Sequence, residues 1–211
     1  MQRERVCLVD HPMAQHKLSL LRDASTTSKQ FRELVREIAM IEGCEATRDL
    51  PLVDVDVTTP ICDARCRRID GKKLVVVPIL RAGLGMVDGM LDLVPSARVG
   101  HLGMYRDEET HEPHSYYANL PEGMSERDAI VVDPMLATGG SATAAIRHLR
   151  EAGARSIKLA VIVASPAGIE AVLAADPDVR IYTCAVDERL NEDAYIVPGL
   201  GDAGDRIFGT I

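Results

Sequence analysis

The sequence predicts an α/β fold with a mostly parallel central sheet flanked by helices. Two continuous apolar runs, at residues 74–77 and 129–132, are typical of strands buried on both faces of a parallel sheet. Stretches with helical spacing of apolar residues lie between such runs, and this alternation of strand and helix indicates crossover connections. Sheets of this kind bind ligands at the carboxyl ends of their strands, so we expect the functional residues there.

The first half of the chain contributes two helices and three strands to this prediction. Either Thr27 or Ser28 is a suitable N-cap for the first helix. The apolar residues of that helix recur at helical spacing: Phe31, Leu34, Val35, Ile38 and Ile41. The other elements of this half follow in order: a half-exposed alternating strand over 52–57, the strand 74–77, a helix over about 84–93 and a strand near 99–105.

The second half begins with residues 106–114, which are polar and show no period, and which indicate a mobile loop or a hairpin tip. The elements after it alternate again: a returning strand over 115–118, the strand 129–132, a helix over 141–151, a strand over 157–164, a helix from Pro166 to about Ala175 and a strand over 179–185. The glycine-rich stretch 195–211 carries few helix signals, so we expect a structured loop with a function. No repeat or linker interrupts the pattern, and we expect a single domain over residues 1–211.

The composition limits the classes of function open to the chain. A net charge of −8 argues against a general nucleic-acid binder, because Lys and Arg supply affinity for the phosphate backbone. No apolar run reaches the roughly 18 residues of a membrane span, and the charged N-terminal residues do not resemble a secretory signal. The five irregularly spaced cysteines predict free thiols and a cytoplasmic location rather than a disulfide framework.

Residues 129–141 give the most specific indication of function. The strand ends at Asp133, and Thr138, Gly139, Gly140 and Ser141 follow just before the predicted helix. Glycines let the backbone approach a ligand closely, and N–H groups at a helix N-terminus attract anions. An acid directly before such a cradle would repel phosphate, so Asp133 is expected to accept hydrogen bonds from sugar hydroxyls. The segment therefore predicts a ribose-phosphate site. The alternative, a strand, a glycine turn and a helix without a ligand, is common for glycine pairs alone.

The segment from Asp133 to Ser141 resembles the phosphoribosyl-pyrophosphate (PRPP) loop of the type I phosphoribosyltransferases. Many relatives carry two adjacent acids at its start, whereas this chain has Asp133 followed by Pro134. Together with this departure, three further segments resemble the uracil phosphoribosyltransferase family: Val77–Met86, Gly103–Thr110 and Tyr195–Asp205. The resemblance extends from about His11 to the C-terminus, so it covers nearly the whole chain.

The resemblance implies transfer of the 5-phosphoribosyl group from PRPP to uracil, which gives UMP and diphosphate in pyrimidine salvage. It assigns PRPP binding to these residues: Arg81, Arg106, Asp133, Pro134, Met135, Leu136, Ala137, Thr138, Gly139, Gly140, Ser141 and Asp202. It assigns uracil binding to a C-terminal base-recognition segment: Ile196, Gly201, Asp202 and Ala203. The implied catalytic residues are Arg106, Asp133 and Asp202.

Two arginines are the implied contacts of the diphosphate. Arg81 follows a buried strand and is expected to grip diphosphate, although pairing with a surface acid is the usual fate of such an arginine. Arg106 opens the polar loop, which is expected to close over the leaving group and exclude water. Without the resemblance, Arg106 would be interpreted as a solvated charge. Mg²⁺ is the expected cofactor, held mainly by the substrate diphosphate, and we expect residues 107–109 to be a solvated acidic face rather than a metal site.

The resemblance also implies a homodimer or a higher homo-oligomer, with activation by GTP in some family members. Relatives often have Tyr before the Glu-Ala-Thr-Arg segment, where this chain has Cys44, so no GTP site is assigned. Two rival functions stay open: a regulator with this fold that binds nucleotide or RNA, and a transferase that acts on a purine or on orotate. The acidic net charge disfavours the regulator. Residues 195–205 lack the extra cation that the orotate carboxylate would demand.

Overall fold

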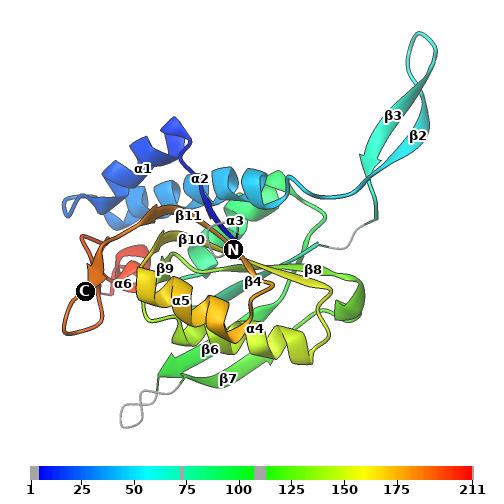
Figure 1. The fold of residues 1–211 in the computed structure, drawn as a ribbon. Coiled ribbons are helices and arrows are strands. Elements are labelled where there is room, and N and C mark those ends of the chain that lie inside the picture. Colours follow the sequence, from blue (N-terminus) through cyan, green and yellow to red (C-terminus); the bar gives the residue numbers. More distant parts are fainter. Residues whose placement is uncertain (1–4, 72–73, 107–112, 211) are drawn as a thin grey trace.

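The fold is built on a central sheet with helices on both faces (Figure 1). The structure is a computed structural model that describes residues 5–71, 74–106 and 113–210, and of residues 105, 106 and 113–115 only the backbone. In spatial order the main strands are β1 (Val6–Leu8), β11 (Arg180–Val186), β10 (Ser156–Ala164), β8 (Asp128–Val132), β4 (Leu74–Leu80), β6 (His101–Arg106) and β7 (Pro113–Asn119). All neighbouring pairs are parallel except β6 and β7, so the predicted fold class is confirmed.

Two short strands join the same sheet beside the main ones. Strand β5 (Arg98–Val99) pairs with β4, and β9 (Met135–Leu136) pairs with β10. The second of these lies directly after β8, inside the segment that resembles the PRPP loop. The hydrogen bonds of β9 therefore fix the start of that loop to the sheet.

The helices divide between the two faces of the sheet (Figure 1). One face is covered by α1 (Pro12–Arg22), α2 (Ser28–Ala46) and α3 (Leu84–Leu93), and the other by α4 (Gly140–Glu151) and α5 (Pro166–Ala175). Successive strand residues alternate between these layers: Val76 and Ile130 pack toward α1–α3, whereas Val75 and Val131 pack toward α4 and α5. Full burial of each such side chain stabilises the fold by about 1.5–3 kcal/mol, which explains the continuous apolar runs.

Among the N-terminal elements, the sequence predicts α2 but not the elements with weaker local signals. Thr27 caps α2 and exchanges hydrogen bonds with Gln30 in a capping box, as the predicted start of that helix requires. Helix α1 and strands β1 and β3 (Asp63–Ile69) are not predicted by the sequence. The N-cap of α1 is His11, which is not one of the usual capping residues, and β3 is largely polar.

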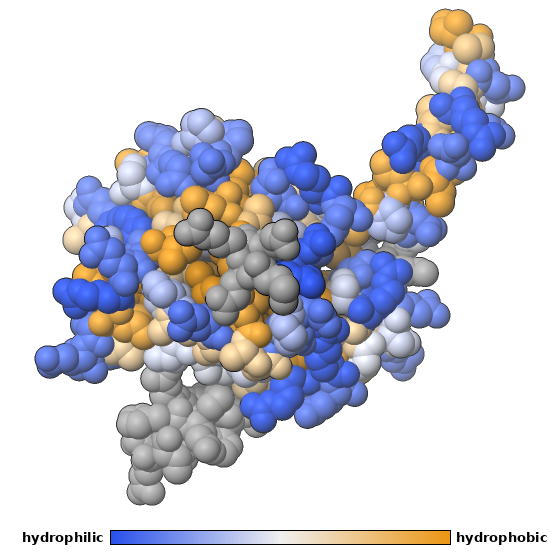
Figure 2. Space-filling view, viewed as in Figure 1, coloured by the Kyte–Doolittle hydropathy of each residue, from blue (hydrophilic) through white to orange (hydrophobic). Residues whose placement is uncertain are grey.

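A long hairpin projects from the body of the molecule (Figure 1). It consists of β2 (Leu52–Thr58) and β3, which pair only with each other among the described strands. The predicted half-exposed strand is thus confirmed, but its apolar side chains do not face the central sheet. Apolar residues reach the hairpin end (Figure 2), where Ile61 is 92% exposed. We refer to residues 52–69 as the arm.

The C-terminal segment is more ordered in secondary structure than the sequence predicts. It contains the short paired strands β12 (Arg189–Leu190) and β13 (Ile196–Val197), and helix α6 (Ala203–Phe208) follows an irregular turn. Residues 198–202 form the structured loop that the glycines predict, whereas the expectation of a loop was wrong for the strand 196–197 and the helix 203–208. A helix of six residues is too short to show a period in the sequence.

Two further observations complete the comparison with the sequence. The predicted mobile loop at 106–114 lies mostly outside the described residues, because 107–112 are not among them. No helix in the described ranges combines the length and the apolar character needed to cross a membrane.

Candidate active site

The candidate site lies at the carboxyl edge of the central sheet, where β4 and β8 end side by side. Pro78 pairs with Val132 in the last register position of these two strands. Arg81 follows β4 directly after Leu80, and Asp133 follows β8 directly after Val132. The sheet therefore brings together two predicted site residues that are 52 positions apart in the sequence (133 − 81).

The segment from Asp133 to Ser141 forms a loop that opens into α4. Most of its predicted PRPP-binding residues line one small depression: Asp133, Met135, Leu136, Ala137, Thr138, Gly139, Gly140 and Ser141. Pro134 is buried and does not line it; its carbonyl oxygen instead accepts hydrogen bonds from the N–H groups of Ile162 and Val163. Helix α4 begins at Gly140, and the first N–H groups of a helix have no partner within it, so they suit an anion at this point.

Gly139 is required by both the conformation and the packing of this loop. Its φ is +85°, which disfavours a residue with a Cβ, and a Cβ there would come within 2.8 Å of the Ala171 Cβ on α5. The loop is fixed further by Ser165, whose hydroxyl donates to the Ala137 carbonyl oxygen at 2.6 Å. The loop is therefore fixed by its own packing and hydrogen bonding, so little ordering is needed when an anion binds.

Asp133 connects this loop electrostatically with the C-terminal segment. Removal from water raises the pKa of the Asp133 carboxyl to about 7, a hydrogen bond from the Met135 N–H lowers it, and the charge of Asp202 raises it. Two carboxylates therefore lie near each other, one from each of the predicted PRPP and uracil regions. Such a pair is unfavourable without a cation or hydroxyl donors between them.

Arg81 contacts two residues of the C-terminal segment. Its Nη2 lies 3.3 Å from Asp205 Oδ1, and its guanidinium lies 5.8 Å from the centre of the Phe208 ring. The arginine side chain is 57% exposed, so this ion pair contributes little to stability. The sequence left two alternatives for Arg81, diphosphate binding and pairing with a surface acid, and the described contact is the second of them. Its acid lies in the candidate site itself.

The base-recognition segment combines two buried apolar residues with an exposed glycine. Ile196 and Ala203 are buried, and Gly201 is exposed with a φ of +75°. Asp202 caps α6, and its Oδ1 accepts a hydrogen bond from the Asp205 N–H at 2.9 Å. A Cβ at Gly204 would lie 3.2 Å from this Oδ1 and 3.7 Å from Arg81 Nη2, so the predicted PRPP and uracil residues are neighbours here.

Arg106 is a predicted site residue of which the structure describes only the backbone. Its backbone ends β6, which pairs with β4 through Leu80 and Gly103, so it emerges at the same edge of the sheet as Arg81. The Arg106 side chain lies outside the described part of the chain, and so do residues 107–109. Within the described ranges, no group of three or more His, Cys, Asp or Glu side chains is placed to hold a metal ion.

The sequence analysis missed three residues that hold the site together. Arg22, at the end of α1, binds Asp187 and the backbone of Gly199, and Asp205 pairs with Arg81. One signal was available for Asp187: it directly follows β11, as Asp133 directly follows β8. No local signal identifies Arg22, because its partners lie more than 160 positions away in the sequence.

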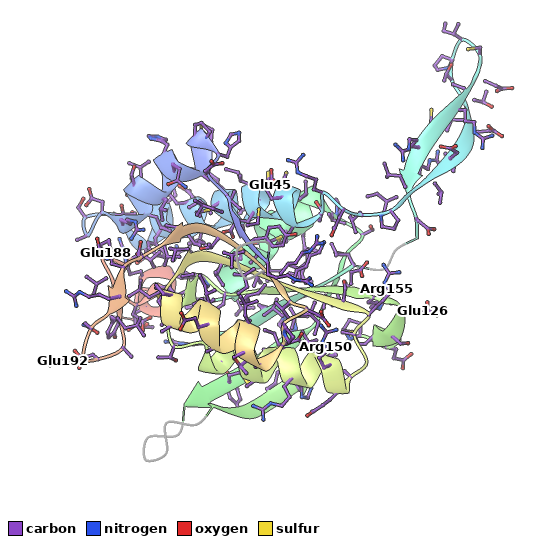
Figure 3. All side chains as sticks on the ribbon, in the orientation of Figure 1. Glu45, Glu126, Arg150, Arg155, Glu188 and Glu192 are labelled. Atoms are coloured by element: carbon purple, nitrogen blue, oxygen red, sulfur yellow. The ribbon has the colours of Figure 1, made fainter. Side chains whose placement is uncertain are left out.

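The larger cavities of the protein lie away from these residues. One of them has a volume of about 360 Å³ and lies at the amino edge of the sheet, beside Arg155, Lys158 and Arg180. Figure 3 shows Arg155 at the end of the molecule opposite Glu188 and Glu192 of the C-terminal segment. All three basic side chains are already paired with Asp128 or Asp49. Cavity size therefore does not locate the site, whereas the convergence of loops does.

Comparison with known proteins identifies the family to which the chain belongs. The uracil phosphoribosyltransferase family matches residues 8–210 of the chain. The uracil phosphoribosyltransferase of Clostridium novyi (strain NT) is 59% identical over 206 residues, which cover 98% of this chain and 99% of the relative. That of Thermoanaerobacter sp. (strain X514) is 61% identical over 207 residues, with the same coverage. The solved structure of the AQ2163 protein from Aquifex aeolicus matches with a TM-score of 0.91 and 38% identity, over 96% of this chain and 97% of that one. The chain therefore belongs to the uracil phosphoribosyltransferase family.

Proposed function

We propose that this protein transfers the 5-phosphoribosyl group of PRPP to uracil, giving UMP and diphosphate. The observation that carries the proposal is the meeting of two regions at Asp133 and Asp202, one with an anion cradle and one with exposed backbone polar groups. Together with family membership, this meeting supports a site that holds a sugar phosphate and a base side by side.

In the proposed complex, each part of PRPP has its own partners. The N–H groups of residues 137–141 bind the 5′-phosphate, because they open onto one depression at the start of α4. Asp133 accepts hydrogen bonds from the ribose hydroxyls. Arg81 exchanges its contact with Asp205 for the diphosphate, which carries more negative charge than one carboxylate. We propose Arg106 as a second diphosphate contact because of its position at the end of β6.

Uracil is proposed to bind the backbone of Ile196 and of residues 201–203, as the family resemblance implies. The pairing edge of uracil presents an acceptor, a donor and an acceptor, and the N–H and C=O groups of a fixed turn can complement that order. A base with a mismatched edge leaves these groups unpaired, so the site rejects cytosine. Asp202 stands between this segment and Asp133, where it can orient the ribose.

Mg²⁺ fits the donors at this site, because the neighbouring carboxylates of Asp133 and Asp202 supply the oxygen ligands that it prefers. We propose that the ion binds mainly to the substrate diphosphate, with these two acids beside it. When bound, it would neutralise negative charge on the departing diphosphate.

The proposed reaction is a displacement at the anomeric carbon of the ribose. The bond from this carbon to the diphosphate oxygen breaks, and its electron pair leaves with the diphosphate. A nitrogen of uracil forms the new bond, and its proton passes to solvent. Because positive charge develops on the ribose meanwhile, the enzyme contributes mainly by holding the two reactants in line and by electrostatic stabilisation.

A panel of bases tests the proposal. The protein is incubated with PRPP, Mg²⁺ and one base at a time (uracil, cytosine, orotate or hypoxanthine), and nucleotide formation is followed by chromatography. We expect UMP from uracil and no product from the other bases. Turnover of another base without turnover of uracil would contradict the assignment, and so would a failure of all four bases.

We also propose a homo-oligomeric state, supported by the arm, whose apolar side chains find no partner in the central sheet.

A cytoplasmic location is proposed from the five free cysteines, which suit a reducing compartment. For GTP we propose no binding site, and adding GTP to the panel measures whether it changes the rate.

A further inference from the structure

We propose that Arg22 and Asp187 are positioning residues for residues 196–203. This stretch contains the predicted uracil contacts, and we refer to it as the uracil-binding segment. This inference rests on the proposed function, because it assigns a task to residues that do not themselves lie among the predicted uracil contacts. The two residues come from separate elements: Arg22 is the last residue of α1, and Asp187 follows the end of β11.

The ion pair forms hydrogen bonds with both backbone polar groups of Gly199. Arg22 binds both carboxylate oxygens of Asp187 at 2.7 Å, and its Nη1 also donates to the Gly199 carbonyl oxygen at 2.7 Å. The second group of the same residue is held as well, since the Gly199 N–H donates to Asp187 Oδ2 at 2.9 Å. Both backbone polar groups of Gly199 are thus fixed by one ion pair.

Gly199 is the residue at which the segment turns. Its φ is +60°, and a Cβ there would collide with the carbonyl oxygen of Ile196. The turn therefore connects Ile196 with Gly201, which are both predicted uracil contacts. Because hydrogen bonds to a base depend on direction, a small rotation of this turn misaligns both ends of the segment.

The ion pair of Arg22 and Asp187 is largely buried. Asp187 is 6% exposed, and its own N–H donates to the Ala164 carbonyl oxygen at 2.8 Å. A second arginine connects the same two regions in the opposite direction: Arg206 of α6 donates to the carbonyl oxygens of Leu21 and Leu200 at 2.8 and 2.9 Å. The end of α1 and the uracil-binding segment are therefore connected by two arginines, Arg22 at Gly199 and Arg206 at Leu200.

The chain offers a matched control in Arg150 and Asp176, which join α4 to α5. This pair also has two contacts between guanidinium and carboxylate, and its acid is similarly buried, at 14% side-chain exposure against 6% for Asp187. Arg150 lies on the face of the sheet away from α1 (Figure 3). Disrupting it destabilises the protein without touching the uracil-binding segment.

The test compares the double variants R22M/D187N and R150M/D176N with the single variant R22K. Changing both partners leaves no unpaired buried charge, which favours folding of the double variants. For R22M/D187N we expect the KM for uracil to rise roughly tenfold or more while the KM for PRPP changes less than about twofold. R22K keeps the charge but not the planar fork, so an intermediate KM for uracil is expected. The control is expected to keep both KM values.

Two results would overturn the inference: an unchanged KM for uracil in R22M/D187N, or an equal rise of both KM values in the two double variants. Amide hydrogen exchange of the ligand-free proteins gives a readout that does not depend on turnover. Exchange over residues 196–204 is expected to be faster in R22M/D187N than in wild type and unchanged in R150M/D176N. If the wild type fails to use uracil, the proposed function fails, while the exchange measurement still decides whether the pair holds the segment.

Discussion

At the scale of single residues, the carboxyl groups of Asp133 and Glu42 have raised pKa values, because burial removes both groups from water. The pKa of Asp133 is raised to about 7 at the candidate site, and that of Glu42 is raised to about 8 in the core. Glu42 is fully buried on α2, where Cys184 Sγ contacts its Oε1 at 3.4 Å. No partner for its Oε2 is found in the described part of the chain. We propose a role in the reaction for Asp133 and a role in stability for Glu42, and each acid predicts its own pH dependence.

Replacing Asp133 with Asn is expected to lower kcat/KM for PRPP by roughly one to two orders of magnitude. Asn carries no negative charge and cannot accept the same hydrogen bonds from the ribose. Because the carboxylate is the active form, kcat/KM of the wild type should rise with pH through about 7, and the rise should be absent in D133N. Steady-state kinetics from pH 5.5 to 8.5 measure both effects, with D176N as the control; wild-type kinetics in D133N would remove Asp133 from the site.

Glu42 predicts a loss of stability as the pH rises. Its folded pKa of about 8 lies above the ordinary value of 4.5, so the folded state binds the proton more tightly than the unfolded state does. The stabilisation is complete below about pH 4.5, declines as the pH rises, and is lost above about 8. E42Q keeps the neutral form at every pH, so its free energy of unfolding should fall less between pH 5 and 8.5, by on the order of 1–4 kcal/mol. Urea unfolding at both pH values measures this; equal slopes in the two proteins would contradict the assignment.

At the scale of elements, the glycine at the start of α4 decides the shape of the anion cradle. G139A is expected to destabilise the protein and to weaken PRPP binding about tenfold or more, because the new Cβ meets Ala171 and the backbone of Gly168. Gly123 is a matched control, since its φ is +71° but nothing lies within 4 Å of a Cβ there. G123A should lose about 1 kcal/mol from backbone strain alone and keep its PRPP affinity. Calorimetric titration with PRPP compares the two variants, and equal affinities would show that the cradle tolerates a side chain.

The elements also show which parts of the fold a sequence reveals. The buried run of β4 is a local signal and was predicted correctly, and the cap of α2 is Thr27, one of the two residues that the sequence left open. The glycines after Asp133 likewise predicted the loop that lines the depression. Helix α1 and strand β3 lack such signals. The contact of Arg22 with Asp187 depends on the folded positions of two distant segments, so no local pattern carries it.

At the scale of the whole molecule, the arm is the feature that the central sheet does not explain. Its two strands pair only with each other among the described strands, and isolated two-stranded hairpins are marginally stable in water. Leu52, Val53, Ile61 and Ile69 are all exposed on it. These exposed side chains are the reason for the proposed oligomer, in which a second copy of the chain would cover them.

Replacing residues 53–68 with a short glycine-containing turn is therefore expected to shift the protein toward the monomer. Strands β2 and β3 form no pairs with the central sheet, so the body of the protein is expected to remain folded. Sedimentation velocity measures the mass of both forms, and circular dichroism checks that the fold is retained. An unchanged oligomer in the shortened protein would mean that another surface holds the copies together, and a monomeric wild type would exclude the proposed assembly.

The contact between Arg81 and Asp205 has a consequence for selectivity among anions. Because the carboxylate is attached to the same chain, it competes for the guanidinium at an effective concentration on the order of millimolar or higher. A free monovalent anion such as chloride or acetate at lower concentration does not win that competition. A ligand with two phosphate groups that engaged the loop and the arginine together would have the advantage of bivalency. The contact with Asp205 is therefore expected to favour such ligands over small monovalent anions.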